Sequence, residues 1–147
     1  MNIRRVVSED WTALKALLLA RGLPALHSGI SSSSVLVGIE DGRVVGVTAL
    51  EIAARDGFSL WLAVEESLEG KGRGTSLLRA LFSRAQELGL RRLYLVGPKL
   101  STPFVAMGFT AISAEEVPGE IRRVRGYPDD LAESRGAILR LQLETRV

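Results

Sequence analysis

Two hydrophobic rhythms organise the middle of the chain. Between residues 35 and 64, β-branched runs are separated by Asp41-Gly42 and by Arg55-Asp56-Gly57, which predicts an antiparallel meander of strands over 35–40, 43–52 and 58–64. From Gly74 to Leu88 the apolar residues recur at helical spacing, and Gly89 follows as a C-cap. The hydrophobic pattern also predicts a strand at 2–6, followed by a helix that Ser8 caps and that stops near Gly22. After the long helix it predicts strands at 91–96, 109–112 and 137–143 and a short helix at 102–107.

The order of elements is therefore a meander, a crossover helix and further strands. The 147 residues, 46% of them hydrophobic, suffice for one compact core. No repeat, low-complexity tract or linker divides the chain, so we predict a single domain over residues 1–147. Trp11, Trp61 and Phe82 are interpreted as core residues.

Composition excludes several kinds of chemistry. The chain has no cysteine and one histidine, which excludes thiolate catalysis and argues against a metal site, so no metal is expected. Its 19 Lys+Arg and 17 Asp+Glu give a net charge of +2, a weak basis for binding nucleic acid. No stretch is apolar enough to span a bilayer or to act as a signal peptide. We expect a cytoplasmic protein with neither a nucleic-acid nor a membrane partner.

A glycine-dense loop joins the last meander strand to the long helix. In Glu69-Gly70-Lys71-Gly72-Arg73-Gly74-Thr75, three alternating glycines let backbone amides converge on an anion at a helix N-terminus. Lys71, Arg73 and the Thr75 hydroxyl strengthen the case for a phosphate or pyrophosphate. The loop lacks the Gly-Lys-Ser/Thr ending of a Walker motif, and a meander does not fit the dinucleotide fingerprint. Taken alone, the pattern is equally typical of a solvated turn.

The loop and its surroundings resemble the GNAT acetyltransferase superfamily. The family signature Arg/Gln-x-x-Gly-x-Gly/Ala aligns with residues 69–74, and Phe104-Val105-Ala106-Met107-Gly108-Phe109 is similar to the family's Tyr-x-x-x-Gly-Phe segment. The segment from Val117 to Arg122, with Tyr127, resembles amino-acid N-acetyltransferases related to N-acetylglutamate synthase, including those of arsenic-resistance operons. The resemblance implies an α/β (α+β) fold with a central mixed, mostly antiparallel sheet flanked by helices. It also implies acetyl transfer from acetyl-CoA to the amino group of a small molecule, an amino acid or an analogue, by a monomer or homodimer.

The family places CoA on the loop amides and on the strand before the loop. By resemblance, the CoA-binding residues are Leu62, Ala63, Val64, Glu69, Gly70, Lys71, Gly72, Arg73, Gly74 and Thr75. Three positions depart from the family pattern: Glu69 replaces Arg or Gln, Gly97 replaces Asn, and Phe104 replaces the tyrosine often proposed to reprotonate the CoA thiolate.

Side chains for the chemistry itself are few. The strand at 58–64 has no carboxylate, so the candidate general bases are Glu51 on the preceding strand and His27 in the loop after the first helix. Either can instead be an ordinary surface residue, with water carrying the proton. Arg122, Arg123 and Arg125 can clamp a substrate carboxylate or form a solvated basic turn. Because side-chain catalysts are few, a CoA-binding sensor or regulatory module of the same fold stays open as an alternative.

Overall fold

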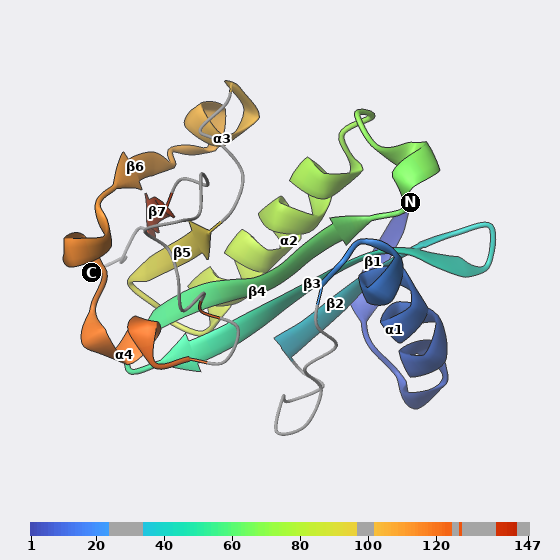
Figure 1. Ribbon diagram of the computed structural model, residues 1–147, viewed down its shortest axis with the longest axis horizontal. Coiled ribbons are helices and arrows are strands. Elements are labelled where there is room, and N and C mark those ends of the chain that lie inside the picture. The colour runs from blue at the N-terminus through green and yellow to red at the C-terminus, as the bar shows by residue number, and fades with distance from the viewer. Residues whose placement is uncertain (24–33, 97–101, 125–126, 128–137, 144–147) are drawn as a thin grey trace. The chain divides into compact units, whose positions relative to one another are not determined.

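The computed structural model describes residues 1–23, 34–96, 102–124, 127 and 138–143 (Figure 1). The chain packs as two units. Unit 1 comprises Met1–Leu50 with Trp61–Ser83, and unit 2 comprises Glu51–Leu60 with Arg84–Val147. The single domain over residues 1–147 stays a prediction.

The strands and helices follow the predicted order along the chain (Figure 1). Seven strands form a mostly antiparallel sheet in the order β1-β2-β3-β4-β5-β7-β6, which confirms the predicted fold class. The strands are β1 (Asn2–Arg5), β2 (Val35–Glu40), β3 (Arg43–Ala53), β4 (Asp56–Val64), β5 (Arg92–Val96), β6 (Thr110–Ile112) and β7 (Ile138–Gln142), and the helices are α1 (Trp11–Ala20), α2 (Arg73–Glu87), α3 (Thr102–Met107) and α4 (Gly119–Arg122). Among the helices of the described residues, none is long and apolar enough to cross a membrane.

Unit 1 is built on the predicted hairpin. Asp41 and Gly42 have φ of 51° and 75°, which is the geometry of a tight two-residue turn between β2 and β3. A Cβ on Gly46 of β3 would lie 2.7 Å from Leu77 Cδ1, so α2 packs directly on this strand. The fully buried side chains of unit 1 include Leu14, Leu18, Val35, Val37, Val45, Val47, Leu77, Leu78 and Leu81. Of the predicted core aromatics, Trp61 is 2% exposed, whereas Trp11 and Phe82 are half-buried.

Two predicted boundaries are wrong. Ser8 does not cap α1, because it lies in a 3-10 turn at Ser8–Asp10 whose Asp10 carboxylate accepts from the Val7 amide at 2.8 Å. The second meander turn lies at Ala54-Arg55, with Ala54 at φ 55°, and not at Asp56-Gly57. Asp56 and Gly57 pair with β5, so a tertiary contact overrides their turn propensity.

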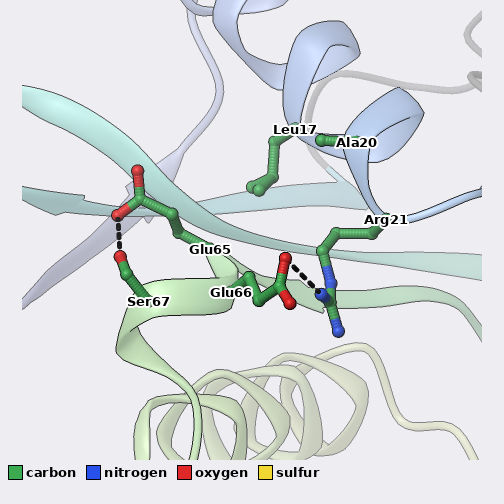
Figure 2. A pocket seen from close by; sticks show the side chains of 6 residues that line it. All are labelled: Leu17, Ala20, Arg21, Glu65, Glu66 and Ser67. Carbon is green, nitrogen blue, oxygen red and sulfur yellow. Dashed lines mark hydrogen bonds and ion pairs between the residues drawn. The ribbon is translucent and has the colours of Figure 1, made fainter.

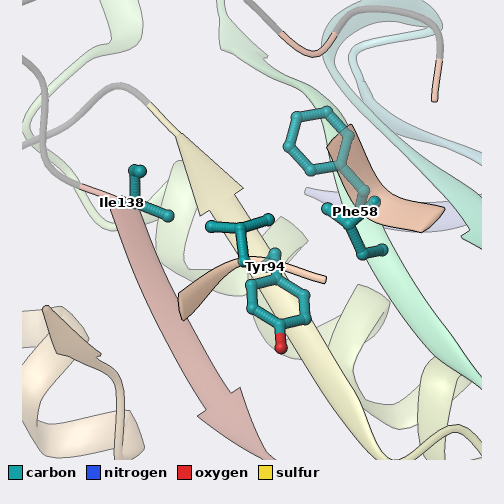
Figure 3. Close-up of a cluster of buried hydrophobic side chains, with 5 residues drawn as sticks. Phe58, Tyr94 and Ile138 are labelled. Carbon is teal, nitrogen blue, oxygen red and sulfur yellow. The ribbon is translucent and has the colours of Figure 1, made fainter. Parts of the chain in front are cut away.

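Unit 2 contains the only parallel strand pair that the described residues show. β4 and β5 pair from Asp56–Arg92 to Phe58–Tyr94, and β5 continues antiparallel to β7. Gly89 ends α2 with φ 73°, as predicted, and the Leu90 amide donates to the Ala85 carbonyl at 3.1 Å. Figure 3 shows the buried cluster of this unit, which comprises Phe58, Tyr94, Val117, Ile121 and Ile138.

Candidate functional site: the glycine loop of unit 1

The loop backbone has the shape that an anion site requires. Gly70 and Gly72 have φ of 78° and 86°, a left-handed region that side chains rarely adopt. A Cβ on either glycine would have no described heavy atom within 4 Å, so this side of the loop is open. α2 begins at Arg73, and its first amide to reach back to the loop is that of Ser76, which donates to the Gly72 carbonyl at 3.0 Å. The amides of residues 73–75 therefore lack intrahelical acceptors and carry the positive end of the helix dipole.

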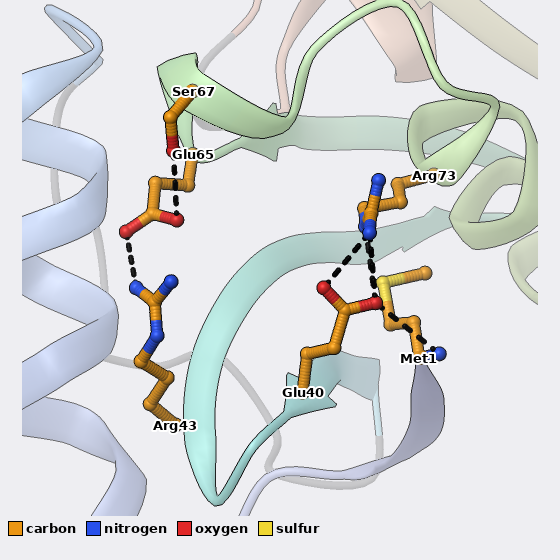
Figure 4. Close-up of polar contacts among 6 residues, drawn as sticks. All are labelled: Met1, Glu40, Arg43, Glu65, Ser67 and Arg73. Atoms are coloured by element: carbon orange, nitrogen blue, oxygen red, sulfur yellow. Dashed lines mark hydrogen bonds and ion pairs between the residues drawn. The ribbon is translucent and has the colours of Figure 1, made fainter.

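An ion pair fixes the side of the loop that leads into α2. The Arg73 guanidinium donates to both carboxylate oxygens of Glu40 on β2, at 2.9 and 3.0 Å from its NH2 group (Figure 4). The N-terminal amine of Met1 lies 3.4 Å from the same carboxylate. The hydrogen bonds from Arg73 lower the pKa of Glu40, and the amine contributes in the same direction. Arg73 is thus committed to β2, whereas Lys71 is exposed and forms no ion pair with a described residue.

A second pair holds the other side of the loop. Arg21, just past the end of α1, binds the Glu69 carboxylate, and its other guanidinium nitrogen lies 4.0 Å from Glu66. Figure 2 shows Arg21 reaching from the end of α1 to Glu66. Both residues line a cavity of about 480 Å³. The cavity is lined by Leu17, Ala20, Arg21, Glu65, Glu66 and Ser67. Glu65 binds Arg43, and that hydrogen bond lowers the pKa of Glu65 (Figure 4).

On β4, every second residue directs its backbone N–H and C=O groups away from β3, toward the side that we call the outer edge of unit 1. The Glu65 amide donates to the Val45 carbonyl of β3 at 2.8 Å. Because backbone groups alternate in direction along an antiparallel strand, Ala63 also faces β3, and Leu62 and Val64 face away from it. The position of Ala63 supports this orientation, because its carbonyl oxygen lies 3.4 Å from a Cβ placed on Gly46 of β3. Of the three predicted strand residues, Leu62 and Val64 therefore offer their N–H and C=O groups to the outer edge.

In unit 2 the parallel ladder stops while both strands continue. The last pair is Phe58–Tyr94, yet β4 proceeds to Ser59 and Leu60 within this unit. Beyond Tyr94, Leu95 and Val96 pair with β7, opposite Leu139 and Ile138. Within unit 2, the described residues thus show no pairing of β4 with β5 beyond Phe58–Tyr94.

The candidate general bases remain predictions. Glu51 lies on β3 in unit 2 and is half-buried, and it has an interaction of its own. His27 lies outside the described residues, as does Gly97.

β4 has one carboxylate, Asp56, because the strand begins two residues before the predicted start at residue 58. Asp56 is the first residue of this strand and is 3% exposed, with its Oδ1 atom 3.9 Å from Arg91 Nε. It opens β4, whereas the glycine loop lies beyond Val64, the last residue of the strand. Its charge also acts on Tyr94, whose pKa is raised first by burial and then by Asp56. We interpret Asp56 as part of the fold of unit 2.

The arginine cluster is partly engaged by the protein itself. Arg122 and Arg123 are exposed at the end of α4, and Arg125 lies outside the described residues. Arg122 donates to the Ala114 carbonyl at 2.6 Å, which leaves other guanidinium donors for a ligand. Tyr127 packs on Phe58 with ring centroids 5.9 Å apart.

Phe104 occupies the position where the family often has a tyrosine. Its ring packs edge to face on the ring of Phe109, with centroids 5.9 Å apart. A phenylalanine side chain has no titratable group, so it cannot act as the general acid. Among the described residues, no group of three or more His, Cys, Asp or Glu side chains is placed to hold a metal ion.

Comparison with known proteins identifies the family. The model of the acetyltransferase (GNAT) family matches residues 5–109. An amino-acid acetyltransferase from Neisseria meningitidis is 32% identical over 111 residues, which are 74% of this chain and 25% of that protein. The chain thus spans about a quarter of the length of the curated relatives it matches.

Solved structures have the same fold. The N-acetylglutamate synthase from Neisseria gonorrhoeae, solved with coenzyme A and N-acetyl-glutamate, is 26% identical with a TM-score of 0.77 and covers 98% of this chain and 35% of its own. The protein Rv2747 from Mycobacterium tuberculosis, at 21% identity and a TM-score of 0.80, covers 98% of this chain and 100% of its own. With the family model matched from the first strand to Phe109, the chain belongs to the GNAT acetyltransferase family.

Proposed function

We propose that the protein transfers an acetyl group from acetyl-CoA to the amino group of a small molecule, and that this acceptor is an amino acid or an analogue. One observation carries the proposal: in a GNAT chain, two left-handed glycines lead into the free amides of a 15-residue helix. The name of the Neisseria meningitidis relative and the N-acetyl-glutamate in the Neisseria gonorrhoeae structure support an amino-acid acceptor.

The open glycine loop fits the pyrophosphate of CoA. A Cβ at Gly70 or Gly72 would have no described heavy atom within 4 Å, so both glycines border open space that a ligand can occupy. We assign the pyrophosphate to the amides between Gly70 and Thr75, with Lys71 as a further cationic partner. The outward backbone groups of Leu62 and Val64 pair with the pantetheine amides. When bound, acetyl-CoA supplies an acyl group activated as a thioester.

The acceptor must arrive as a neutral amine held against the thioester carbonyl. Glu51 and His27 are the candidate bases that remove its proton, with water as the alternative carrier. Arg122, Arg123 and Arg125 are the candidate partners for an acceptor carboxylate, because a guanidinium binds a carboxylate through two parallel hydrogen bonds.

A thiol-release assay with acetyl-CoA tests the proposal. The acceptor panel pairs each amino acid with its carboxamide and with its N-acetyl derivative. Turnover with a free amine, and none with the N-acetyl compound, is the expected result. Preference for the acid over the amide supports a carboxylate partner. CoA binding without turnover of any amine would instead favour a sensor or regulatory module, and no CoA binding at all would end the proposal.

A further inference from the structure

The start of the glycine loop, on the side of β4, is negatively charged, which is unexpected at a binding site for an anion. Glu69 is its first residue, and Glu66 lies in the 3-10 turn just before it. A carboxylate beside a pyrophosphate opposes binding through like-charge repulsion. In the structure neither carboxylate stands alone, since Arg21 binds Glu69 and approaches Glu66 to 4.0 Å.

Arg21 is well placed to hold this end of the loop. Its amide donates to the Leu17 and Leu18 carbonyls at 3.1 and 3.2 Å, which ties its backbone to the end of α1. Leu18 is fully buried, so this helix end is anchored in the core of unit 1. The Arg21 side chain is 28% exposed and that of Glu69 is 47% exposed, so water reaches the pair and screens it in part. A cation at a helix C-terminus is also favourable for the helix dipole.

The other end of the loop is already fixed. Arg73 opens α2 and is bound to Glu40 through three hydrogen bonds of 2.9 to 3.2 Å. Between the two anchored ends, Gly70 and Gly72 adopt left-handed backbone without a side chain to stabilise it. The shape and the charge of the loop entrance therefore depend on the contact that Arg21 makes.

We propose that Arg21 is a positioning residue for CoA: through its ion pair with Glu69 it neutralises and holds the entrance of the glycine loop. The residue lies 48 positions from Glu69 in the sequence and acts through that carboxylate. This inference rests on the proposed binding of CoA at the loop. It adds that CoA affinity is set partly from α1, and that the acidic residue at the loop entrance is tolerated because Arg21 compensates it.

Calorimetric titration with CoA and with pantetheine, which lacks the pyrophosphate, tests this role. Arg21→Gln is expected to weaken CoA binding about two- to fivefold, the range of an ion pair that water reaches, and to leave pantetheine binding unchanged. The double variant Arg21→Gln with Glu69→Gln is expected to recover most of the lost affinity, because the uncompensated carboxylate is gone. Arg84→Gln is the matched control: Arg84 is 23% exposed and pairs with Glu87 at 3.3 Å, on the part of α2 that belongs to unit 2.

The outcomes separate this inference from the proposed function. If the wild-type protein binds CoA and Arg21→Gln binds it equally well, the positioning role is wrong and CoA binding at the loop stands. Equal losses for CoA and pantetheine, or a double variant as weak as Arg21→Gln, would also overturn the role, since they indicate general damage to unit 1. A wild-type protein that does not bind CoA would remove the proposed function and this inference with it. Thermal melts of each variant show whether a loss of affinity reflects unfolding.

Discussion

Alanine substitutions at Gly72 and Gly74 are expected to change stability in opposite directions, although one residue separates them. Gly72 has φ of 86°, where a Cβ is strained whatever space surrounds it, so Gly72→Ala should cost roughly 1–2 kcal/mol of unfolding free energy. Gly74 lies in the first turn of α2, and its Cβ would meet only Val64 Cγ2, at 3.9 Å. Because alanine exceeds glycine in helix propensity by up to about 1 kcal/mol, Gly74→Ala should match or exceed wild-type stability.

The same two variants should also separate CoA binding from folding. A Cβ at Gly72 would enter open space beside the loop, where we propose that the pyrophosphate binds, whereas one at Gly74 would meet Val64. Gly72→Ala should therefore lose CoA affinity and Gly74→Ala should retain it.

Urea unfolding at a fixed temperature measures the stability of both variants, and calorimetric titration measures their CoA affinity. The expected difference in unfolding free energy between them is about 2 kcal/mol. A Gly72→Ala protein as stable as wild type, or a Gly74→Ala protein that is markedly destabilised, would refute the loop geometry. Full CoA affinity in a folded Gly72→Ala variant would refute the assignment of the open face to the ligand.

Three further predictions concern packing, burial and pH. Gly46→Ala should lower the free energy of unfolding by about 1–3 kcal/mol, because its Cβ would lie 2.7 Å from Leu77 Cδ1. Gly119→Ala should cost little, because its Cβ would meet only the flexible end of the Arg123 side chain. Equal effects in chemical unfolding would contradict the packing of α2 on β3. Tyr94→Phe should raise the unfolding free energy by about 1 kcal/mol, because the buried Tyr94 hydroxyl makes no well-formed hydrogen bond to a described residue, although Arg92 acts on it to lower its pKa. A lower melting temperature would show that the hydroxyl does have a partner. The hydrogen bonds of Arg4 lower the pKa of Asp10 below its usual 3.8, so this pair stabilises the fold above that pH and the contribution is lost as the pH falls through the lowered value. Asp10→Asn should therefore lose stability at neutral pH and little in strong acid, and a loss that is the same at both pH values would contradict the ion pair.

Local patterns predicted the elements that local physics determines. The turn at Asp41-Gly42 and the C-cap at Gly89 were correct because each needs positive φ, which these residue types adopt readily. α4 and the 3-10 turn at Glu66–Leu68 were missed, since 4 and 3 residues are too few to show a helical period. Ala54 gave no signal at all, because nothing in its sequence context indicates the left-handed conformation that it adopts.

The sequence predicted the part of the candidate site that backbone groups form, and it did not predict the ion pairs around it. Glycines mark the loop because its left-handed backbone at Gly70 and Gly72 favours glycine, so a pattern in the sequence indicates the geometry. The ion pairs of the loop join residues 48 and 33 positions apart, and they depend on where α1 ends and where β2 runs. No spacing rule relates such residues, so neither Arg21 nor Glu40 could be singled out from the sequence.

The proposed anion site at the loop lies among several carboxylates, and the charges around it indicate what would attract the ligand. Four nearby carboxylates each have a cationic partner: Glu40 has Arg73, Glu65 has Arg43, and Arg21 serves both Glu66 and Glu69. Four carboxylates against three guanidinium groups leave one net negative charge among these side chains, so attraction for an anion must come from the start of α2 and from exposed Lys71. A helix terminus acts over about one turn, and an exposed lysine is screened by salt within roughly 10 Å. Affinity for the pyrophosphate should therefore depend on close backbone contact, and the left-handed glycines of the loop make that contact available.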